Sequence, residues 1–243
     1  MSEDRHYLGG STCSAAAGLS HYLSPYELWR RLTGSVPEPK EPSRYIYWGN
    51  VLEPVVRMHY SILHQCKVYV PAGFGTYVHP TYPWAKATPD GLVLDASDKA
   101  THGLEIKTAD SMQAHRWGRA GSAKVPDEYR AQCTWYMWVT GHRRWDLAVL
   151  IGGNDYREYV LDYDEVFARK LTEACIRFWQ DHVEAMVPPP RTAGHRPEPS
   201  TAEKAEQIAS IRLAVNTLMT AQQKLEYEIG ESISLESIEA LGA

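Results

Sequence analysis

The chain has 243 residues, 44% of them hydrophobic, with eight Trp and fifteen Tyr, so it can bury one substantial core. Its 25 Lys and Arg residues against 30 Asp and Glu residues give a net charge of −5, which excludes a uniformly basic surface and leaves room only for a locally positive channel. The chain contains no run of roughly 18 apolar residues, and it begins without the basic and apolar segments of a secretory leader. We therefore expect a soluble, cytoplasmic protein with no membrane contact.

Neither the cysteines nor the histidines predict a zinc centre. The four cysteines lie far apart along the chain, so we expect reduced thiols at Cys13, Cys66, Cys133 and Cys175. The ten histidines show no His-x-x-x-His spacing. A zinc-dependent hydrolase is therefore an alternative that would need support from a measured stoichiometric zinc content.

Residues 11 to 64 predict three helices. A run of small residues from Ser11 to Gly18 begins the first helix. Ser24-Pro25-Tyr26-Glu27 forms a capping box with Pro at the first helical position of the second helix, which should end near Gly34. After a Pro-rich loop, a longer helix should run from about Arg44 to His64.

The middle of the chain combines strands with helices. From about Cys66 to Lys107, β-branched and aromatic residues are separated by turn residues, which predicts a series of strands. A helix should follow from about Asp127 to Thr140 and end at Gly141. The segments on either side of Gly152-Gly153-Asn154-Asp155 predict a hairpin, and an amphipathic helix should then run from Asp164 to Met186.

A proline-rich segment divides the chain. Residues 188–200 contain five prolines and have the composition of a linker, so we assign residues 1–187 to one folded domain and residues 201–243 to a helical tail. Apolar residues of the tail alternate spacings of three and four at Ile208, Ile211, Val215, Leu218, Leu225 and Ile229, with Gln222 in the same stripe. This stripe fits a helix packed on its own domain and equally a short coiled coil or partner-docking helix.

The most informative pattern is an acidic residue in a turn that is followed, one strand later, by an acid-apolar-Lys tripeptide. Asp90 lies in Thr88-Pro89-Asp90-Gly91, and a strand later comes Leu104-Glu105-Ile106-Lys107. The combination has the form of a PD-(D/E)XK nuclease site. Each half alone is weak, because Pro-Asp-Gly is a common turn and Glu-Ile-Lys also arises on solvated strands. Together, between predicted strands, they indicate a metal-dependent phosphodiester hydrolase.

Phosphodiester hydrolysis explains why these residue types would be needed. Cations neutralise the charge that develops on the phosphate and help to deprotonate water. Magnesium prefers oxygen ligands and keeps several waters, so Asp90, Glu105 and the backbone carbonyl of Ile106 could hold it. Because side chains alternate along a strand, Glu105 and Lys107 should share one face while Ile106 enters the core. Lys107 could then orient the attacking water and stabilise the transition state.

Two predicted helices carry further polar residues. Glu53 lies in a helix that otherwise buries Leu52, Val56 and Tyr60, and its simplest interpretation is a surface acid. The helix from Asp127 presents hydrogen-bonding groups suited to phosphates on one face, at positions i, i+3 and i+7: Tyr129, Gln132 and Tyr136. The rest of that helix should pack in the core.

Six co-linear segments together resemble the lambda exonuclease, or YqaJ-like viral recombinase, family of PD-(D/E)XK nucleases. They are Arg5 with Leu8-Gly9-Gly10-Ser11, Ser24 to Trp29, Trp48 to Glu53, Thr88 to Gly91, Leu104 to Lys107, and Tyr129 to Gly141. The similarity covers about residues 5 to 186 and does not extend to the tail. It implies an α/β fold with a restriction-endonuclease-like core, in which a central mixed β-sheet is flanked by helices. We expect the site at the edge of that sheet.

The resemblance also implies an activity and partners. Family members degrade one strand of linear double-stranded DNA in the 5′-to-3′ direction with two Mg²⁺ ions, which Mn²⁺ can replace, and leave 3′ single-stranded overhangs. The overhangs serve phage-type homologous recombination by strand annealing. The resemblance implies a homotrimeric ring around DNA, a single-strand annealing protein as partner, and a phage- or prophage-encoded protein in the cytoplasm of a bacterial host.

By motif, the resemblance assigns a role to each candidate residue. Asp90, Glu105 and the Ile106 carbonyl would bind metal, Lys107 would serve the attacking water, and Glu53 would complete the acidic cluster. The residues expected to bind DNA and its 5′-phosphate are Arg5, Ser11, Thr88, Tyr129 and Gln132. An arginine suits this task because its planar fork contacts two phosphate oxygens. His6 could substitute for Arg5, whose register so near the start of the sequence is open.

Two further functions compete with this interpretation. A structure-selective endonuclease or a single-strand nuclease would keep the fold, and it would differ by cutting DNA that lacks a free duplex end. A catalytically silent protein that binds DNA ends as a scaffold would need no combination of Asp90, Glu105 and Lys107. The intact acid set therefore favours an enzyme.

Overall fold

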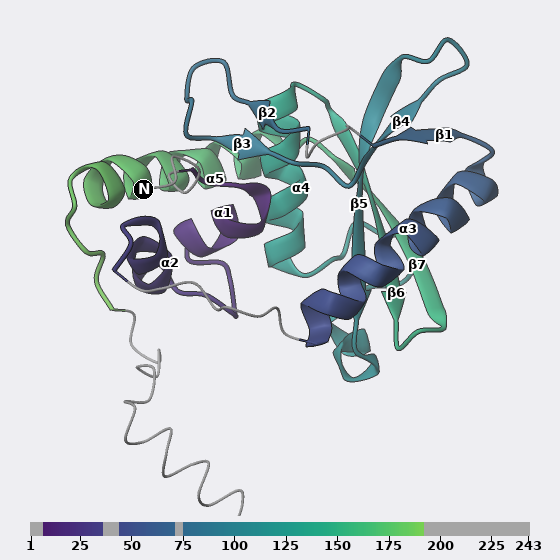
Figure 1. Cartoon of the computed structure of the whole chain (residues 1–243), viewed down its shortest axis with the longest axis horizontal. Helices are drawn as coiled ribbons and strands as arrows, with labels where there is room; N and C mark the ends of the chain where they lie inside the picture. Colours follow the sequence, from purple (N-terminus) through teal and green to yellow (C-terminus); the bar gives the residue numbers. More distant parts are fainter. Residues whose placement is uncertain (1–6, 36–43, 71–74, 192–243) are drawn as a thin grey trace, which may run out of the picture. The chain divides into compact units, whose positions relative to one another are not determined.

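The computed structural model describes residues 7–35, 44–70 and 75–191, which form a mixed sheet flanked by helices (Figure 1). The sheet has five strands in the order β1-β4-β5-β6-β7. Their bounds are β1 (Lys67–Tyr69), β4 (Gly91–Leu94), β5 (Ala100–Ala109), β6 (Arg144–Ile151) and β7 (Asp155–Asp162). β5 and β6 are parallel and the other neighbours are antiparallel. Two short strands, β2 (Tyr77–Val78) and β3 (Lys86–Ala87), pair separately.

Helices cover both faces of the five-stranded sheet. One face packs against α3 (Arg44–His64), and the other packs against α4 (Asp127–Thr140). Behind α4 lie α1 (Gly10–Ala16), α2 (Pro25–Leu32) and α5 (Glu165–Phe178), which continues as the π-helical turn η3 (Trp179–Glu184). A 3₁₀ segment, η2 (Ser111–Arg116), follows β5 (Figure 1). No helix in the described ranges is long and apolar enough to cross a membrane.

The caps explain where these helices begin and end. The Glu27 N–H donates to Ser24 Oγ at 3.2 Å and the Ser24 N–H donates to Glu27 Oε2 at 3.0 Å, which is the predicted capping box of α2. Gly141 ends α4 with a φ of 79°, a left-handed conformation that glycine adopts without steric cost. The hairpin between β6 and β7 turns through Gly152 and Gly153 with φ of 59° and 83°. The predicted helix ends and hairpin are therefore confirmed.

The sheet separates two cores. On the α3 side, Ile106 of β5 packs with Val56 and Tyr60 in a small cluster. On the α4 side, a larger cluster includes the fully buried Trp135, Trp145 and Leu147. Gly103 of β5 lies beneath the Trp145 ring, where an added Cβ would come within 2.2 Å of ring carbons. The missing side chain therefore lets the indole lie directly over the central strand.

Two expectations about the fold were wrong. β5, which carries Glu105 and Lys107, is the third of five strands, so the predicted site lies on the central strand and not at the sheet edge. Leu52 is only half-buried, because the buried stripe of α3 runs through Val56 and Tyr60. The predicted tail, 201–243, and most of the predicted linker lie outside the described residues.

Candidate active site

Strand β5 places Glu105 and Lys107 together on its α4 face. The Glu105 side chain is 1% exposed and the Lys107 side chain 21%. Lys107 Nζ donates to Glu105 Oε1, and Gln132 Nε2 of α4 donates to the same oxygen. Between them, Ile106 enters the opposite core, as strand alternation predicts. A buried carboxylate is thus held by a lysine and an amide at the centre of the sheet.

Asp90 lies in the turn that precedes β4. Gly91 pairs with Leu104, and the next step along β5 is taken up by the side chain of Asp90, whose Oδ2 accepts the Ile106 N–H at 2.7 Å. Because the N–H and C=O of one strand residue point to the same neighbour, the Ile106 carbonyl faces the same side of β5 as Asp90. The structure therefore gathers Asp90, Glu105 and the Ile106 carbonyl at one point of the strand.

Glu53 approaches this point from α3. Its carboxylate pairs with Arg57 one turn later, and Arg57 Nε donates to the backbone oxygen of Asp90 at 3.1 Å. Arg57 thus connects the helix to the turn that carries Asp90. The sequence interpretation missed this residue, although the i, i+4 spacing of Glu53 and Arg57 on a predicted helix is a usable signal.

The carboxylates are close enough to perturb one another. Burial, followed by the charge of Asp90, raises the pKa of Glu105 to about 8. Burial and then Asp90 also raise the pKa of Glu53, against the opposing charges of Arg57 and Lys107. Burial alone would lower the pKa of Lys107, but the carboxylates of Glu105 and Asp90 outweigh it and raise that pKa. Three carboxyl groups, those of Glu53, Asp90 and Glu105, thus share only two nearby cations, Arg57 and Lys107.

The oxygen atoms of this cluster are suited to a hard cation. Across the described part of the chain, no three Asp, Glu, His or Cys side chains already stand at metal-binding distances from one another. However, Glu105 Oε2 is buried without any hydrogen-bond partner, and a buried carboxylate oxygen without a partner is costly. Asp90 Oδ1 likewise accepts no hydrogen bond from the described residues. Asp90 and Glu105 therefore each keep one available carboxylate oxygen, and together with the Ile106 carbonyl this donor set fits magnesium or manganese.

A cavity of about 410 Å³ adjoins the cluster on the α4 side. Ser11, Tyr129 and Gln132, three of the residues predicted to bind DNA, line it together. Thr88 is not among its lining residues; it is exposed and its Oγ1 lies 3.2 Å from Thr76 Oγ1. Arg5 lies outside the described residues. Gln132 belongs both to the cavity and to the contacts of Glu105, so it joins the two places.

Close packing fixes Gln132 in that position. Its Nε2 also donates to the Tyr136 hydroxyl at 2.9 Å. Gly10, the first residue of α1, lies against both side chains, and an added Cβ would stand 2.3 Å from Tyr136 Cε1 and 3.0 Å from Gln132 Cγ. The absence of a side chain at Gly10 thus allows α1 to approach the α4 residues that face Glu105.

Comparison with known sequences identifies the family. Residues 3–143 match the family model of the YqaJ-like viral recombinase domain. The chain belongs to the YqaJ-like viral recombinase family. It is 32% identical over 183 residues to the uncharacterized protein YqaJ of Bacillus subtilis (strain 168), which covers 74% of this chain and 54% of YqaJ. This YqaJ-like chain thus spans about half the length of that curated relative.

Solved structures show the same fold. The alkaline exonuclease LHK-Exo from Laribacter hongkongensis matches with a TM-score of 0.55 and 19% identity, covering 75% of this YqaJ-like chain and 90% of LHK-Exo. Its complex with dAMP gives the same TM-score at 20% identity, with the same coverage of both chains. A phage-related exonuclease from Haemophilus somnus 129PT matches with a TM-score of 0.51 and 11% identity over 74% of this chain and 96% of its own. The predicted fold class is confirmed.

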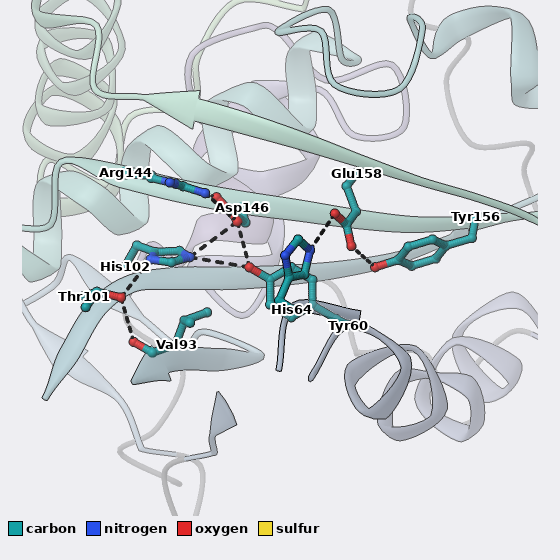
Figure 2. Close-up of polar contacts among 9 residues, drawn as sticks. All are labelled: Tyr60, His64, Val93, Thr101, His102, Arg144, Asp146, Tyr156 and Glu158. Carbon is teal, nitrogen blue, oxygen red and sulfur yellow. Dashed lines mark hydrogen bonds and ion pairs between the residues drawn. The ribbon is translucent and has the colours of Figure 1, made fainter. Parts of the chain in front are cut away.

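This YqaJ-like chain buries a second carboxylate on the α3 face of the sheet (Figure 2). Asp146 of β6 accepts hydrogen bonds from Tyr60 at 2.7 Å and from Arg144 at 2.8 and 3.0 Å, and His102 Nε2 lies 3.3 Å from its Oδ2. Burial alone would raise the pKa of Asp146, but the hydrogen bonds from His102, Arg144 and Tyr60 outweigh it and hold that pKa below its ordinary value. This group is fully partnered.

Proposed function

We propose that this chain is a metal-dependent exonuclease that degrades one strand of linear double-stranded DNA in the 5′-to-3′ direction. It starts at 5′-phosphorylated ends and leaves 3′ single-stranded overhangs for recombination by strand annealing. The observation that carries the proposal is the buried Glu105 carboxylate, which contacts Lys107 and Gln132 and keeps one oxygen without a partner. Membership of the family and the fold shared with exonucleases support it.

Asp90, Glu105 and the Ile106 carbonyl would hold two Mg²⁺ ions, for which Mn²⁺ can substitute. When bound, these ions would neutralise the charge that develops on the scissile phosphate and favour deprotonation of water. Glu53 completes the acidic cluster, and its contact with Arg57 keeps its carboxylate beside Asp90. The raised pKa values of Glu53 and Glu105 support a cluster that needs added positive charge.

Lys107 has the central role among the chain's own groups. Its ammonium is cationic and partly exposed, so it can donate hydrogen bonds to the attacking water and to a non-bridging phosphate oxygen. It also lies 5.5 Å from the centre of the Tyr129 ring, which limits its freedom. Gln132, Tyr129 and Ser11 would hold the 5′ end in the adjoining cavity. The family resemblance adds Arg5 and Thr88 as further phosphate-binding residues.

One assay tests the proposal against its competitors. Purified protein with Mg²⁺ is incubated with linear duplex DNA bearing 5′-phosphate or 5′-hydroxyl ends and with closed circular DNA. Asp90→Ala serves as the inactive control. We expect loss of the 5′ strand from phosphorylated linear DNA alone, and none with Asp90→Ala. Cutting of circles would favour an endonuclease, and no cutting of any substrate would favour a DNA-end-binding scaffold.

We also propose a homotrimeric ring around the DNA and a single-strand annealing protein as partner. These assignments follow from the family resemblance. Residues 188–243 contribute no residue to the candidate active site, so they are available for assembly or for docking a partner. Measuring the mass in solution with and without residues 188–243 tests whether this segment contributes to assembly. If the protein without residues 188–243 is still a trimer, the segment is not needed for assembly, and docking of the annealing partner becomes its proposed role.

A further inference from the structure

The outer face of α3 exposes a continuous apolar stripe. The face that packs against β1, β5 and β6 buries Val56 and Tyr60, each 2% exposed. On the roughly opposite face, large apolar residues recur at alternating spacings of three and four: Trp48, Val51, Val55, Met58 and Ile62. Each of these five residues is between 43% and 69% exposed. The stripe, called the α3 seam below, therefore has an apolar surface that the described residues leave in contact with solvent.

The spacing of the α3 seam is typical of packing between helices. Alternating intervals of three and four keep apolar residues on one line along a helix, and two such lines interlock when helices pair. The positions that flank the line hold Tyr47, Leu52, Pro54, His59 and Ser61. None of these is Asp, Glu, Lys or Arg, the residues that usually set partner choice beside such a line. The flanks therefore do not repel a second helix of the same sequence.

The α3 seam is nearly symmetric about Val55. Trp48 lies seven residues before Val55, and Ile62 lies seven residues after it. Val51 lies four residues before Val55, and Met58 lies three residues after it. In an antiparallel pair of α3 helices centred on Val55, Trp48 would face the smaller Ile62, and Met58 would face the smaller Val51. A surface that complements itself in this way is what a twofold contact between identical chains requires.

The exposed apolar area is large enough for a stable contact. The flanking Tyr47 and the nearby Leu63 are 55% and 56% exposed and widen the seam. If a large apolar side chain has about 150–200 Å² of surface, the exposed fractions of these residues and the seam leave on the order of 600 Å². Monomers rarely expose a larger contiguous apolar patch, and a standard interface buries about 800 Å² on each partner. The α3 seam thus supplies most of one partner's share.

We propose that α3 pairs with α3 of a second copy of this chain, antiparallel and with the twofold axis near Val55. The contact leaves the candidate active site open, because Glu53 lies on the side of α3 away from the seam, beside Asp90. A ring of three joins two different surfaces of neighbouring subunits, whereas a twofold contact uses the same surface on both. The α3 contact is therefore separate from the proposed ring, and it does not depend on the nuclease activity. It joins two chains or, where rings form, two rings.

The test places a charge at the proposed axis in the full chain. Val55→Lys and Val55→Glu are compared with Val166→Lys, a matched control in α5. Both valines lie in helices, and their exposures are similar, 50% for Val55 and 55% for Val166. Sedimentation equilibrium or light scattering measures the mass in solution at micromolar concentration. The urea midpoint of each variant checks that its fold is retained.

The parent protein should contain an even number of subunits, because a twofold contact joins chains or rings in pairs. Each Val55 variant alone should have half the parent mass, since two like charges meet at the axis and weaken association about a hundredfold or more. An equimolar mixture of Val55→Lys and Val55→Glu should recover the parent mass, because opposite charges then meet there. Val166→Lys should keep the parent mass.

Several results would overturn the α3 contact. These are an odd number of subunits in the parent, a parent mass retained by Val55→Lys, and a mass halved equally by Val166→Lys. A mixture of the two Val55 variants that stays at half mass would mean that α3 contacts something other than α3. A mass that falls on deletion of residues 188–243, but not in the Val55 variants, would assign the contact to that segment. A trimer insensitive to Val55→Lys would reject the α3 contact and leave the proposed ring in place.

Discussion

Two buried carboxylates on adjacent strands, Glu105 of β5 and Asp146 of β6, have opposite environments. Asp146 faces α3 and has Tyr60, Arg144 and His102 around it, which hold its pKa below the ordinary value against the effect of burial (Figure 2). Glu105 faces α4, keeps Oε2 without a partner, and has its pKa raised to about 8 by burial and by Asp90.

Under the proposed function, the difference separates a structural carboxylate, Asp146, from a functional one, Glu105. A buried charge whose acceptors are all satisfied stabilises the fold in its ionised form. A buried carboxyl that lacks donors and lies beside a second acid is costly in its ionised form, and this cost falls when a cation arrives. Within one sheet, the protein's own groups thus satisfy one carboxylate, and under the proposed function a bound cation would complete the other.

The largest effect should come from Lys107→Ala, which removes the cation beside Glu105. We expect kcat to fall by about 10² to 10³, because the charge aimed at the transition state is lost, while DNA binding changes little. Single-turnover rates and binding of linear duplex DNA measure the two quantities. Lys99→Ala, an exposed change in the β4–β5 connection, is the matched control and should keep the parent rate. A near-normal rate for Lys107→Ala would remove this residue from the mechanism.

The next prediction compares removal of each negative charge. In metal-free buffer at pH 7, Asp146→Asn should lower the free energy of unfolding by roughly 2–4 kcal/mol, since it breaks a partly buried charge network. Glu105→Gln should cause no comparable loss and can raise stability, because a carboxyl whose pKa is raised by folding must keep a proton at pH 7 that the unfolded chain releases, which disfavours folding. Urea unfolding midpoints measure both values. Equal losses for the two variants would contradict the contrast between the carboxylates.

Lowering the pH should reduce the loss of stability caused by Asp146→Asn. The pKa of Asp146 is depressed in the folded chain, so its contribution is present above its unfolded pKa of about 4 and is lost as pH falls below that value toward the folded pKa. Over that range the unfolded chain takes up a proton that the folded chain excludes. The difference in stability between the parent and Asp146→Asn should therefore be constant above about pH 6 and shrink below pH 4. A difference that grows in acid would have the wrong sign.

Local sequence signals predicted most of the elements, including the strand that carries Glu105 and Lys107. The capping box at Ser24 and the glycine at 141 define helix ends by interactions a few residues long. The pair Glu105 and Lys107 follows from strand alternation alone. The site on the central strand was not predictable in this way, because strand order depends on pairing between distant segments. The same holds for the contact between Tyr60 and Asp146, which are 86 residues apart in the sequence.

The smallest predicted effect concerns Tyr60, one of the hydrogen-bond donors to the Asp146 carboxylate. Tyr60→Phe removes the 2.7 Å hydrogen bond to Asp146 and leaves Arg144 and His102 in place, so it should cost about 1 kcal/mol of stability and leave nuclease activity unchanged. In an Asp146→Asn background the same change should cost less, because the charge that strengthens the bond is gone. Urea unfolding of the two single variants and the double variant measures this coupling. Additive losses would mean that Tyr60 stabilises the α3 face through packing, and that Asp146 is held by Arg144 and His102 alone.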